Sequence, residues 1–333
     1  MFLRAHVYSH KIVAMIISKH KLFDPNGFSW KVAYCFLLFL GSLFLYSCKE
    51  KEVEYSNNNC KVSPPFINKL GFNPANSYLS TSDGQKIGLV LTEAVDPNNL
   101  AMGSTRTYQD SSWKMAGWLA PIQIDDKGNV FVAPVPFINV LHNPARQQNT
   151  LYKLEGQTGK MAPFINLPLP DSINSNNPFG IIGLAYLCES NTLYISTVAT
   201  SNRQAEHGAI YEVDAATAKI TGKITDIDVL GMGIAYTDGH RKLYFGKARN
   251  PAIYSVMLNK DGSFSGRPQP EFTLEGLGPR GDDKVRRIRL DKDGSLLVYG
   301  MEFNFNLIAP REKQEMLYHF VYNEEERKWM YAP

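Results

Sequence analysis

Two strand–turn–strand patterns alternate along most of this chain, and they constrain its fold more than any other feature. One pattern has an aliphatic residue, Tyr and a further apolar residue before a polar turn, as in "AIYEVDAATAKITGKI". Its copies begin at Thr150, Ala209, Ala252 and Met316. The other pattern precedes each copy and has an Asp/Asn/Gly turn between two apolar strands, as in "PIQIDDKGNVFVA" and "IRLDKDGSLLVYG". A fainter pair lies upstream, as "SYLSTSDGQKIGLVL" and "TRTYQDSSWKMAG".

Together the two patterns define a repeat of four strands, A to D, made of an A–B hairpin and a C–D hairpin. The B strands are expected to start near Lys86, Asn129, Thr192, Lys242 and Ser295, at intervals of 43 to 63 residues. Four strands in a period of about 40–50 residues are typical of a β-propeller. One such sheet cannot bury both of its faces, whereas sheets packed radially in a closed ring do so and protect their edges. The sequence therefore predicts an all-β fold, a β-propeller of four-stranded blades.

The number of blades is left at five or six. Five copies of the repeat indicate five blades, and a degenerate copy in residues 60–80 would make six. The units "GLAYLCESNTLYIS" and "IYEVDAATAKITGKI" resemble the NHL-like and gluconolactonase/strictosidine-synthase-like propeller superfamily, over roughly residues 70–333. Because propellers of that superfamily are commonly six-bladed, the resemblance favours six.

The N-terminal part has the layout of a secretory signal peptide. Residues 32–46 form an apolar run without a charge, with Lys31 before it and "SCKEKEVE" after it. The run is shorter than the roughly 20 residues of a membrane span, although an uncleaved anchor is the alternative. Leu45–Cys48, "LYSC", resembles the lipobox of bacterial lipoproteins, in which the Cys thiolate takes a diacylglycerol. Several acyl chains on Cys48 would hold a folded domain firmly at a membrane.

These features predict three segments. Residues 1–47 are expected to be a lipoprotein signal peptide with an extended N-terminus, residues 48–65 the lipidated Cys and a solvated tether, and residues 66–333 the β-propeller domain. Lys49 at position +2 resembles an outer-membrane sorting signal, and the Lys/Glu tract after it resembles the surface-export signal of Bacteroidota lipoproteins. We therefore expect a lipoprotein of the cell envelope, held at the outer membrane on its periplasmic or surface side.

Two of the four cysteines fall in the mature, non-lipidated part of the chain, Cys60 and Cys188. The oxidising compartment permits a disulfide between them. Cys188 lies in the strand pattern "LAYLCES", however, and a buried free thiol is the preferred interpretation.

The charge of the chain gives no reason to expect a nucleic-acid partner. Of the formal net charge of +3, residues 1–47 contribute +4, from five basic residues and one Asp, so the mature part carries −1. A nearly neutral domain lacks the basic surface that binds nucleic acid.

The long connections of the predicted propeller all fall between strands B and C, as in "PVPFINVLHNPARQQN", "TVATSNRQAEHG", "GKARNPA" and "MEFNFNLIAPREKQE". In a propeller the B–C and D–A connections share one face, so these loops should surround one end of the central channel, as in a ligand-binding face. The alternative for each polar residue of these loops is a structural role, in which it ends a strand or ties loops together. The candidate ligand-binding residues of the loops are His142, Asn143, Arg146, Arg203, His207, Arg249, Asn250, Glu302, Asn304, Asn306 and Arg311, with the aromatic Phe137, Phe303 and Phe305.

A second candidate is the inner strand "DDKVRRIRLD" of the last blade. It carries Arg286, Arg287 and Arg289 close to the channel, and an anion site is the functional interpretation. The alternative is that these arginines form inter-blade ion pairs with nearby acids, namely Asp282, Asp283 or Asp291.

The sequence predicts no catalytic residue, metal site or cofactor. The resemblance implies a divalent metal held at the channel by Glu, Asn and Asp, with an Asp before the Gly of strand A. The corresponding stretches here, "NPFGIIGLAY" and "VLGMGIAY", have no carboxylate. The "DKDG" and "NKDG" stretches lack the later ligands of a calcium loop and are expected to be hairpin turns. No nucleophile triad, phosphate loop or Cys/His metal spacing is present.

The sequence therefore predicts a lipid-anchored envelope propeller that binds a glycan, a peptide or an envelope protein through its B–C loops, without catalysis. The alternative is a metal-dependent lactonase or hydrolase with its site at the channel. If Arg203, His207 and Arg249 are exposed loop residues, changing them to Ala should leave the melting temperature nearly unchanged.

The lipid anchor is testable by one substitution. Cys48→Ala removes the acceptor thiol, so it should abolish acylation and release the protein from the outer-membrane fraction. Metabolic labelling with a fatty acid, followed by membrane fractionation, measures both effects. Label that still enters the variant would show that the lipobox assignment is wrong.

Overall fold

A computed structural model of the chain describes residues 62–81, 86–94, 105–136, 139–169, 177–307 and 314–333. The chain divides between Glu54 and Tyr55, and all described residues lie in the second part. The proposed signal peptide, Cys48 and most of the proposed tether fall outside the described residues and stay predictions. Within the described ranges, no helix is long and apolar enough to cross a membrane.

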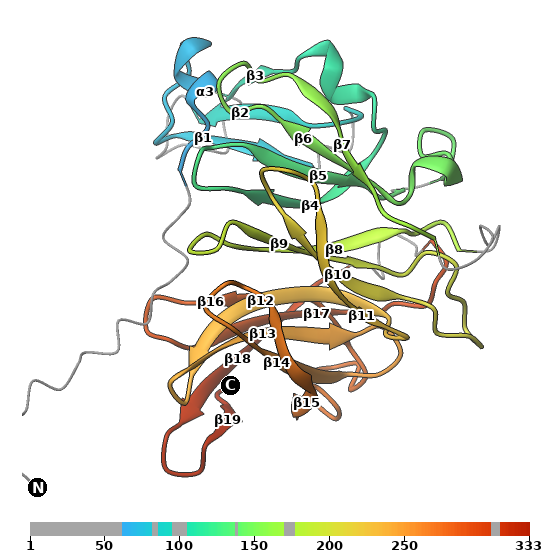
Figure 1. The fold of residues 1–333 in the computed structure, drawn as a ribbon, viewed down its shortest axis with the longest axis vertical. Helices are drawn as coiled ribbons and strands as arrows, with labels where there is room; N and C mark the ends of the chain where they lie inside the picture. Colours follow the sequence, from blue (N-terminus) through green and yellow to red (C-terminus); the bar gives the residue numbers. More distant parts are fainter. Residues whose placement is uncertain (1–61, 82–85, 95–104, 137–138, 170–176, 308–313) are drawn as a thin grey trace, which may run out of the picture. The chain divides into compact units, whose positions relative to one another are not determined.

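The described residues form five antiparallel sheets, numbered here as blades one to five along the chain (Figure 1). Blade one comprises β1 Ser77–Ser80, β2 Val90–Ala94 and β3 Thr105–Tyr108. Blade two comprises β4 Leu119–Ile124, β5 Val130–Pro134, β6 Thr150–Leu154 and β7 Met161–Asn166. Blade three comprises β8 Ile181–Leu187, β9 Thr192–Thr197, β10 Ala209–Asp214 and β11 Ile220–Thr225.

Blade four comprises β12 Val229–Thr237, β13 His240–Lys247, β14 Ala252–Leu258 and β15 Phe264–Thr273. Blade five comprises β16 Lys284–Leu290, β17 Leu296–Met301, β18 Met316–Asn323 and β19 Lys328–Tyr331. Three short helices complete the described elements: α3 Pro65–Lys69, η2 Ser111–Lys114 and η3 Ala145–Gln147.

The fold confirms an all-β, five-bladed propeller, and in blades two to five strands A to D pair in sequence order. The six-bladed form that the family resemblance favours is wrong for this chain. Residues 65–69 form the helix α3, and residues 77–80 form β1, the A strand of blade one, so the stretch 60–80 holds no additional sheet among its described residues.

The A–B hairpins of blades two and five close through acidic side chains that cap their own turns. In blade two the Asp125 carboxylate accepts hydrogen bonds from the backbone N–H of Lys127 and Asn129, at 2.9 and 2.7 Å. In the "DKDG" turn of blade five, Asp293 accepts the backbone N–H of Ser295 at 2.9 Å and its hydroxyl at 2.6 Å. These carboxylates serve the turn itself. The expectation that "DKDG" is a hairpin turn is confirmed.

Neighbouring blades bury each other's faces in four apolar clusters. Blades one and two share the cluster around Trp113, and blades two and three the one around Phe131. The next two interfaces contain Phe245 and Tyr244. Between the described parts of blades five and one there is no comparable cluster, and Leu317 on blade five is 53% exposed. The continuous ring of apolar interfaces that a closed propeller predicts is thus present at four junctions of the described chain.

Blade one departs from the repeat because a helical turn stands where strand D is expected. The Asp110 carboxylate caps η2 by accepting the N–H of Ser112 at 2.9 Å. Trp113 in η2 is fully buried, and its indole N–H donates to the carbonyl of Gly159 at 2.6 Å. Its ring packs edge-on against Phe66 of α3, with centroids 5.8 Å apart. Trp113 therefore joins α3, blade one and blade two.

Cys188 is disulfide-bonded, so the preferred interpretation of a buried free thiol is wrong. The other three cysteines of the chain fall outside the described residues. Strand β8 ends at Leu187, which places Cys188 just beyond the strand in a partly exposed turn. A strand interior would have enclosed the thiol, whereas a turn leaves it accessible to another segment.

Trp113 gives a test of this packing. Trp113→Ala should lower the free energy of unfolding by about 3–5 kcal/mol, because it empties a core position and removes a buried hydrogen bond. Met115→Ala, two residues away at a side chain that is 45% exposed, should change it by less than about 0.5 kcal/mol. Urea denaturation followed by circular dichroism measures both. Equal effects of the two substitutions would contradict the assigned role of Trp113.

Candidate functional site

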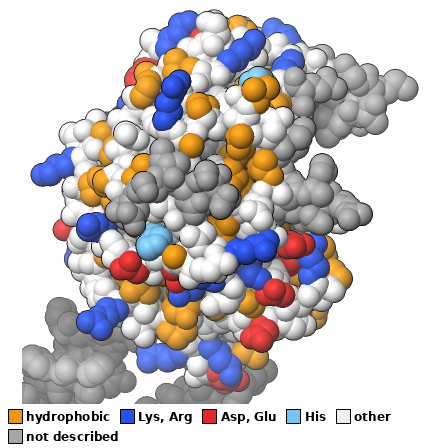
Figure 2. Space-filling model, turned by 90° about the vertical axis from the view of Figure 1, so that its right-hand side faces the viewer, with side chains coloured by type: hydrophobic (Ala, Val, Ile, Leu, Met, Phe, Trp, Pro, Cys, Tyr) orange, Lys and Arg blue, Asp and Glu red, His pale blue; other side chains and the backbone are white. Residues whose placement is uncertain are grey.

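The long B–C connections and the D–A connections lie on one face of the propeller, which we call the B–C face. This follows from the antiparallel order of each blade, in which strands B and D end on the side where C and the next A begin. The connection from β5 to β6, which contains η3, projects at the right of Figure 1. Figure 2 views the molecule from that side and shows basic, acidic and apolar side chains interspersed. The surface in this view has no charge patch of one sign.

An apolar plug fills the end of the channel below this face. It consists of buried side chains from blades three, four and five: Phe179, Ile182, Val198, Leu230, Ala248, Phe303 and Phe305. The ring of Phe303 lies 5.4 Å from that of Phe179 and 5.2 Å from that of Phe305. Phe303 and Phe305 retain only 8% and 5% of their exposure, so the expectation that both present aromatic surface on the rim is wrong. Phe137, the third aromatic candidate, lies outside the described residues.

Above the plug is a cavity of about 150 Å³. Its walls are mostly apolar and come from four blades: Thr81, Trp118, Phe179, Ile182, Phe303 and Leu307 are among them. Arg286 is the charged side chain among its described lining residues. Residues that are far apart in the sequence thus meet at the channel end, which is where propellers and other ring-shaped folds offer a ligand site.

The close packing of inner strands places Arg286 at the cavity. A Cβ added to Gly231 in β12 would lie 2.4 Å from the carbonyl carbon of Arg286 in β16, so only glycine permits this approach. The pairing of β16 with β17 shifts register between Val285 and Arg287. Arg286 lies at this irregularity, and it extends across the channel to donate a hydrogen bond from Nη1 to the carbonyl of Ile182, at 2.9 Å.

The electrostatic state of Arg286 is unusual. Burial lowers the pKa of its guanidinium, and the carboxylate of Glu315 opposes that shift. An arginine nevertheless stays protonated at neutral pH. Among the described residues Arg286 forms no ion pair, since Glu315 is bound to Arg287 at 2.7 Å. A partly buried positive charge therefore lines a mostly apolar cavity, and no carboxylate of the described residues is paired with it.

The neighbouring arginines face away from the cavity. Arg287 lies over the ring of Tyr299 at 4.0 Å and is paired with Glu315 of its own blade. Arg289 is exposed, with its guanidinium 5.8 Å from the same ring. In the described structure, no ion pair joins these arginines to Asp282 or Asp283, two of the acids considered for them. Two of the proposed acids are bound elsewhere: Asp283 to Arg280, and Asp282 to Lys284.

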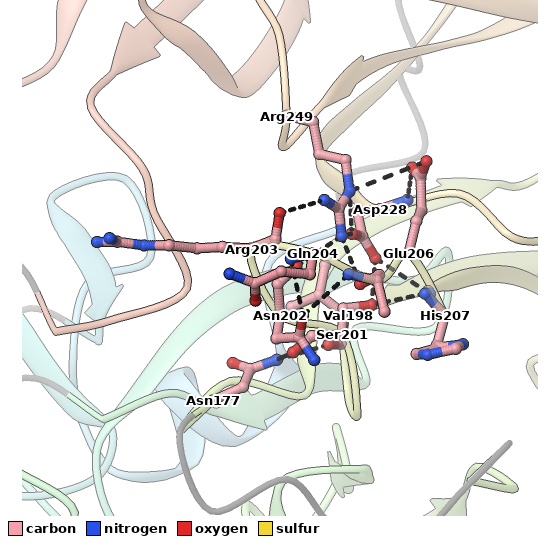
Figure 3. Close-up of polar contacts among 12 residues, drawn as sticks. Asn177, Val198, Ser201, Asn202, Arg203, Gln204, Glu206, His207, Asp228 and Arg249 are labelled. Carbon is pink, nitrogen blue, oxygen red and sulfur yellow. Dashed lines mark hydrogen bonds and ion pairs between the residues drawn. The ribbon is translucent and has the colours of Figure 1, made fainter.

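Arg249 ties the loop between β9 and β10 to blade four (Figure 3). Its Nε donates to the buried carboxylate of Asp228 at 3.0 Å, and its Nη2 donates to the carbonyl of Asn202 at 2.6 Å. Nη1 donates to the carbonyl of Arg203 at 3.1 Å, and a further bond reaches Ala205. The expectation that Arg249 is an exposed loop residue of little consequence for stability is wrong.

Asp228 is the acceptor on which this loop depends, and sequence reasoning missed it. Besides Arg249, its carboxylate accepts the N–H of Gly208 at 3.0 Å and the hydroxyl of Ser201. Burial raises the pKa of Asp228, while the hydrogen bond from Ser201 and the charge of Arg249 act in the opposite direction. A carboxylate with no exposed surface in this position requires these donors.

The remaining candidates divide into exposed and structural side chains. The ring of His142 is exposed and lies 6.5 Å from that of Trp118. Asn143 is buried and holds strand β4 in place, because its amide bonds both the N–H and the carbonyl of Trp118, at 3.1 and 2.8 Å. Asn250 caps its own turn by accepting the N–H of Ala252 at 3.1 Å.

Four of the other side chains, those of Arg146, Arg203, Glu302 and Asn306, are exposed. His207 is partly buried, and its backbone N–H donates to the hydroxyl of Ser201 at 2.9 Å. Asn304 is partly buried, and its Oδ1 is buried without a hydrogen-bond partner among the described residues. Arg311 lies outside those residues. The structure thus brings Arg203, His207 and Arg249 together around one loop, while ligand contact by any of these candidates stays a prediction.

The described residues contain no group of three or more His, Cys, Asp or Glu side chains placed to hold a metal ion. The carboxylates near the channel are occupied in capping loops and pairing with arginines, as for Asp228 and Glu315.

Comparison with known proteins assigns no family to this chain. No model of a known protein family matches the sequence, and no curated protein does. Among solved structures, a glucose dehydrogenase is 16% identical over 72% of this chain and 77% of its own, with a TM-score of 0.40. The soluble aldose sugar dehydrogenase of Escherichia coli is 18% identical over 72% of this chain and 78% of its own, with a TM-score of 0.39. The β-propeller domain of Cps50 (Swd1) from Myceliophteria thermophila is 9% identical over 77% of this chain and 69% of its own, with a TM-score of 0.44. At such identities no activity carries over to this chain.

The role assigned to Arg249 can be tested against its neighbour. Arg249→Ala leaves the buried carboxylate of Asp228 without its charged partner, so it should lower the free energy of unfolding by about 3 kcal/mol. Arg203→Ala removes an exposed side chain of the same type from the same loop and should cost less than about 0.5 kcal/mol. Urea unfolding at neutral pH compares them. A loss below about 1 kcal/mol for Arg249→Ala would show that the contacts are not stabilising.

Proposed function

We propose that this chain is a lipid-anchored propeller of the bacterial outer membrane that binds a ligand at the cavity on its B–C face, without catalysing a reaction. The "LYSC" pattern and the apolar run before it support the anchor. We also propose that the chain is related in architecture to the NHL-like and gluconolactonase-like propellers.

The observation that carries the binding site is the position of Arg286. Its guanidinium lies in a mostly apolar cavity and has no ion-pair partner among the described residues. Burying a charge without a counter-charge costs stability, and proteins retain such groups most often where they serve a ligand. The cavity also has the general composition of a small-molecule site, with apolar walls and very few polar groups that orient the ligand.

The exposed loop residues offer a second layer of contacts around such a site. His142, Arg146, Arg203 and Asn250 lie on B–C connections and can donate hydrogen bonds. They suit the outer part of a glycan or peptide, or the surface of an envelope protein that presents the ligand. Arg249, by contrast, would affect binding indirectly, because it fixes the position of the loop between β9 and β10.

A substitution that fills the cavity tests its role. Leu307→Trp places a large ring at the cavity wall, and Leu141→Trp makes the same change at an exposed position on a B–C loop, where Leu141 is 76% exposed. Benzyl alcohol and benzoate are the probes, each titrated into the full chain in lipid nanodiscs by isothermal calorimetry. At least one probe should bind the unaltered protein, and Leu307→Trp should weaken that binding by about tenfold or more, because it removes the space that the probe needs.

Leu141→Trp should leave the affinity within about twofold, since an exposed side chain is not part of the cavity. Absence of binding by both probes, or an equal loss in the two variants, would contradict a ligand site at this cavity.

A further inference from the structure

We infer that the cavity selects a small monoanion, namely a carboxylate with one ring or a short aliphatic chain, and that Arg286 contacts its charge. This inference rests on the proposed function and specifies the class of ligand. It follows from three properties of the site: the free donors of Arg286, the balance of charge, and the size and nature of the walls.

The donors of Arg286 are only partly used. A guanidinium has five N–H groups in a planar fork, and the described structure uses one of them, in the bond from Nη1 to the carbonyl of Ile182 at 2.9 Å. That bond fixes one edge of the group against blade three. The remaining donors have no acceptor among the described residues. A carboxylate matches a guanidinium fork with two parallel hydrogen bonds, which makes it a better partner than a single hydroxyl.

The balance of charge favours a single negative charge. Glu315, the acid that influences Arg286, is engaged by Arg287 at 2.7 Å. One anionic group therefore neutralises the site. A dianion, such as a phosphate monoester, would bring a second charge against apolar walls, where no described side chain compensates it.

The walls determine the rest of the molecule. Trp118, Phe179, Ile182, Phe303 and Leu307 present rings and aliphatic groups, so the body of the ligand must be apolar. The volume of about 150 Å³ lies below the range of about 300–1,000 Å³ that is usual for larger ligands. The part of the ligand that enters is limited to about one ring or a short chain.

The adjacent arginines provide a matched control. Arg289 lies on the same strand as Arg286, but it is exposed and faces away from the cavity. Arg286→Met and Arg289→Met therefore make the same chemical change inside and outside the proposed site. Benzoate, benzyl alcohol and phenyl phosphate share one ring and differ in charge, so they separate the apolar contribution from the electrostatic one.

The experiment titrates these three compounds into the full chain in nanodiscs by isothermal calorimetry, with both variants in parallel. Benzoate should bind the unaltered protein at least about tenfold more tightly than either of the other compounds, because a charge-assisted hydrogen bond is worth about 1.5–3 kcal/mol. Arg286→Met should reduce that preference to about twofold or less. Arg289→Met should preserve it.

The outcomes separate the inference from the proposed function. If benzyl alcohol binds as tightly as benzoate and Leu307→Trp weakens both, the cavity is a binding site and the inference about charge is overturned. If phenyl phosphate binds most tightly, selection of a monoanion is overturned. If none of the three binds, both the site and the inference fail. Should Arg286→Met not fold, the preference of the unaltered protein alone decides between charge selection and its absence.

Discussion

The rest of the structure depends on how closely the inner strands approach one another. Gly183 and Gly231 lie in β8 and β12, at positions where a Cβ would meet the backbone of the next blade. This spacing lets each sheet bury a face against its neighbour, as the four clusters of the described residues show. It also lets Arg286 of blade five donate a hydrogen bond to the carbonyl of Ile182 in blade three. The cavity exists because the channel is narrow enough for a few side chains to close it.

Two arginines on the B–C face illustrate how the surroundings of a charge decide its role. Arg249 reaches the carboxylate of Asp228 and three backbone carbonyls, and these partners account for four of its five donors. Arg286 has one carbonyl and no carboxylate among the described residues. The first is therefore a structural tie, and the second has donors that no described residue accepts. Both were candidates by residue type and by their place near the channel end, and only the contacts distinguish them.

The architecture could be predicted from the sequence because each hairpin carries its own signal, in alternating apolar residues and an Asp/Asn/Gly turn. The predicted starts of B strands near Asn129, Thr192 and Ser295 agree with β5, β9 and β17. The predictions differ from the structure at residues whose contacts are determined by packing between blades. The contacts of Arg249 and the burial of Phe303 depend on other blades. The direction of Arg286 depends on a register shift that interrupts strand alternation. The expectation of six blades differs from the structure because it rests on the superfamily resemblance, whereas the repeats themselves indicate five.

The junction between blades five and one has a consequence for how the described part of the propeller responds to a ligand. Four apolar interfaces join the blades in a row, so the stability of the whole resembles a sum over neighbours, with the fifth junction contributing least. The cavity spans this seam, since Thr81 belongs to blade one and Arg286 to blade five. A ligand that contacts both blades would hold them together. Its binding free energy would then add to the free energy needed to separate blades five and one, so ligand binding and the stability of this junction would be coupled.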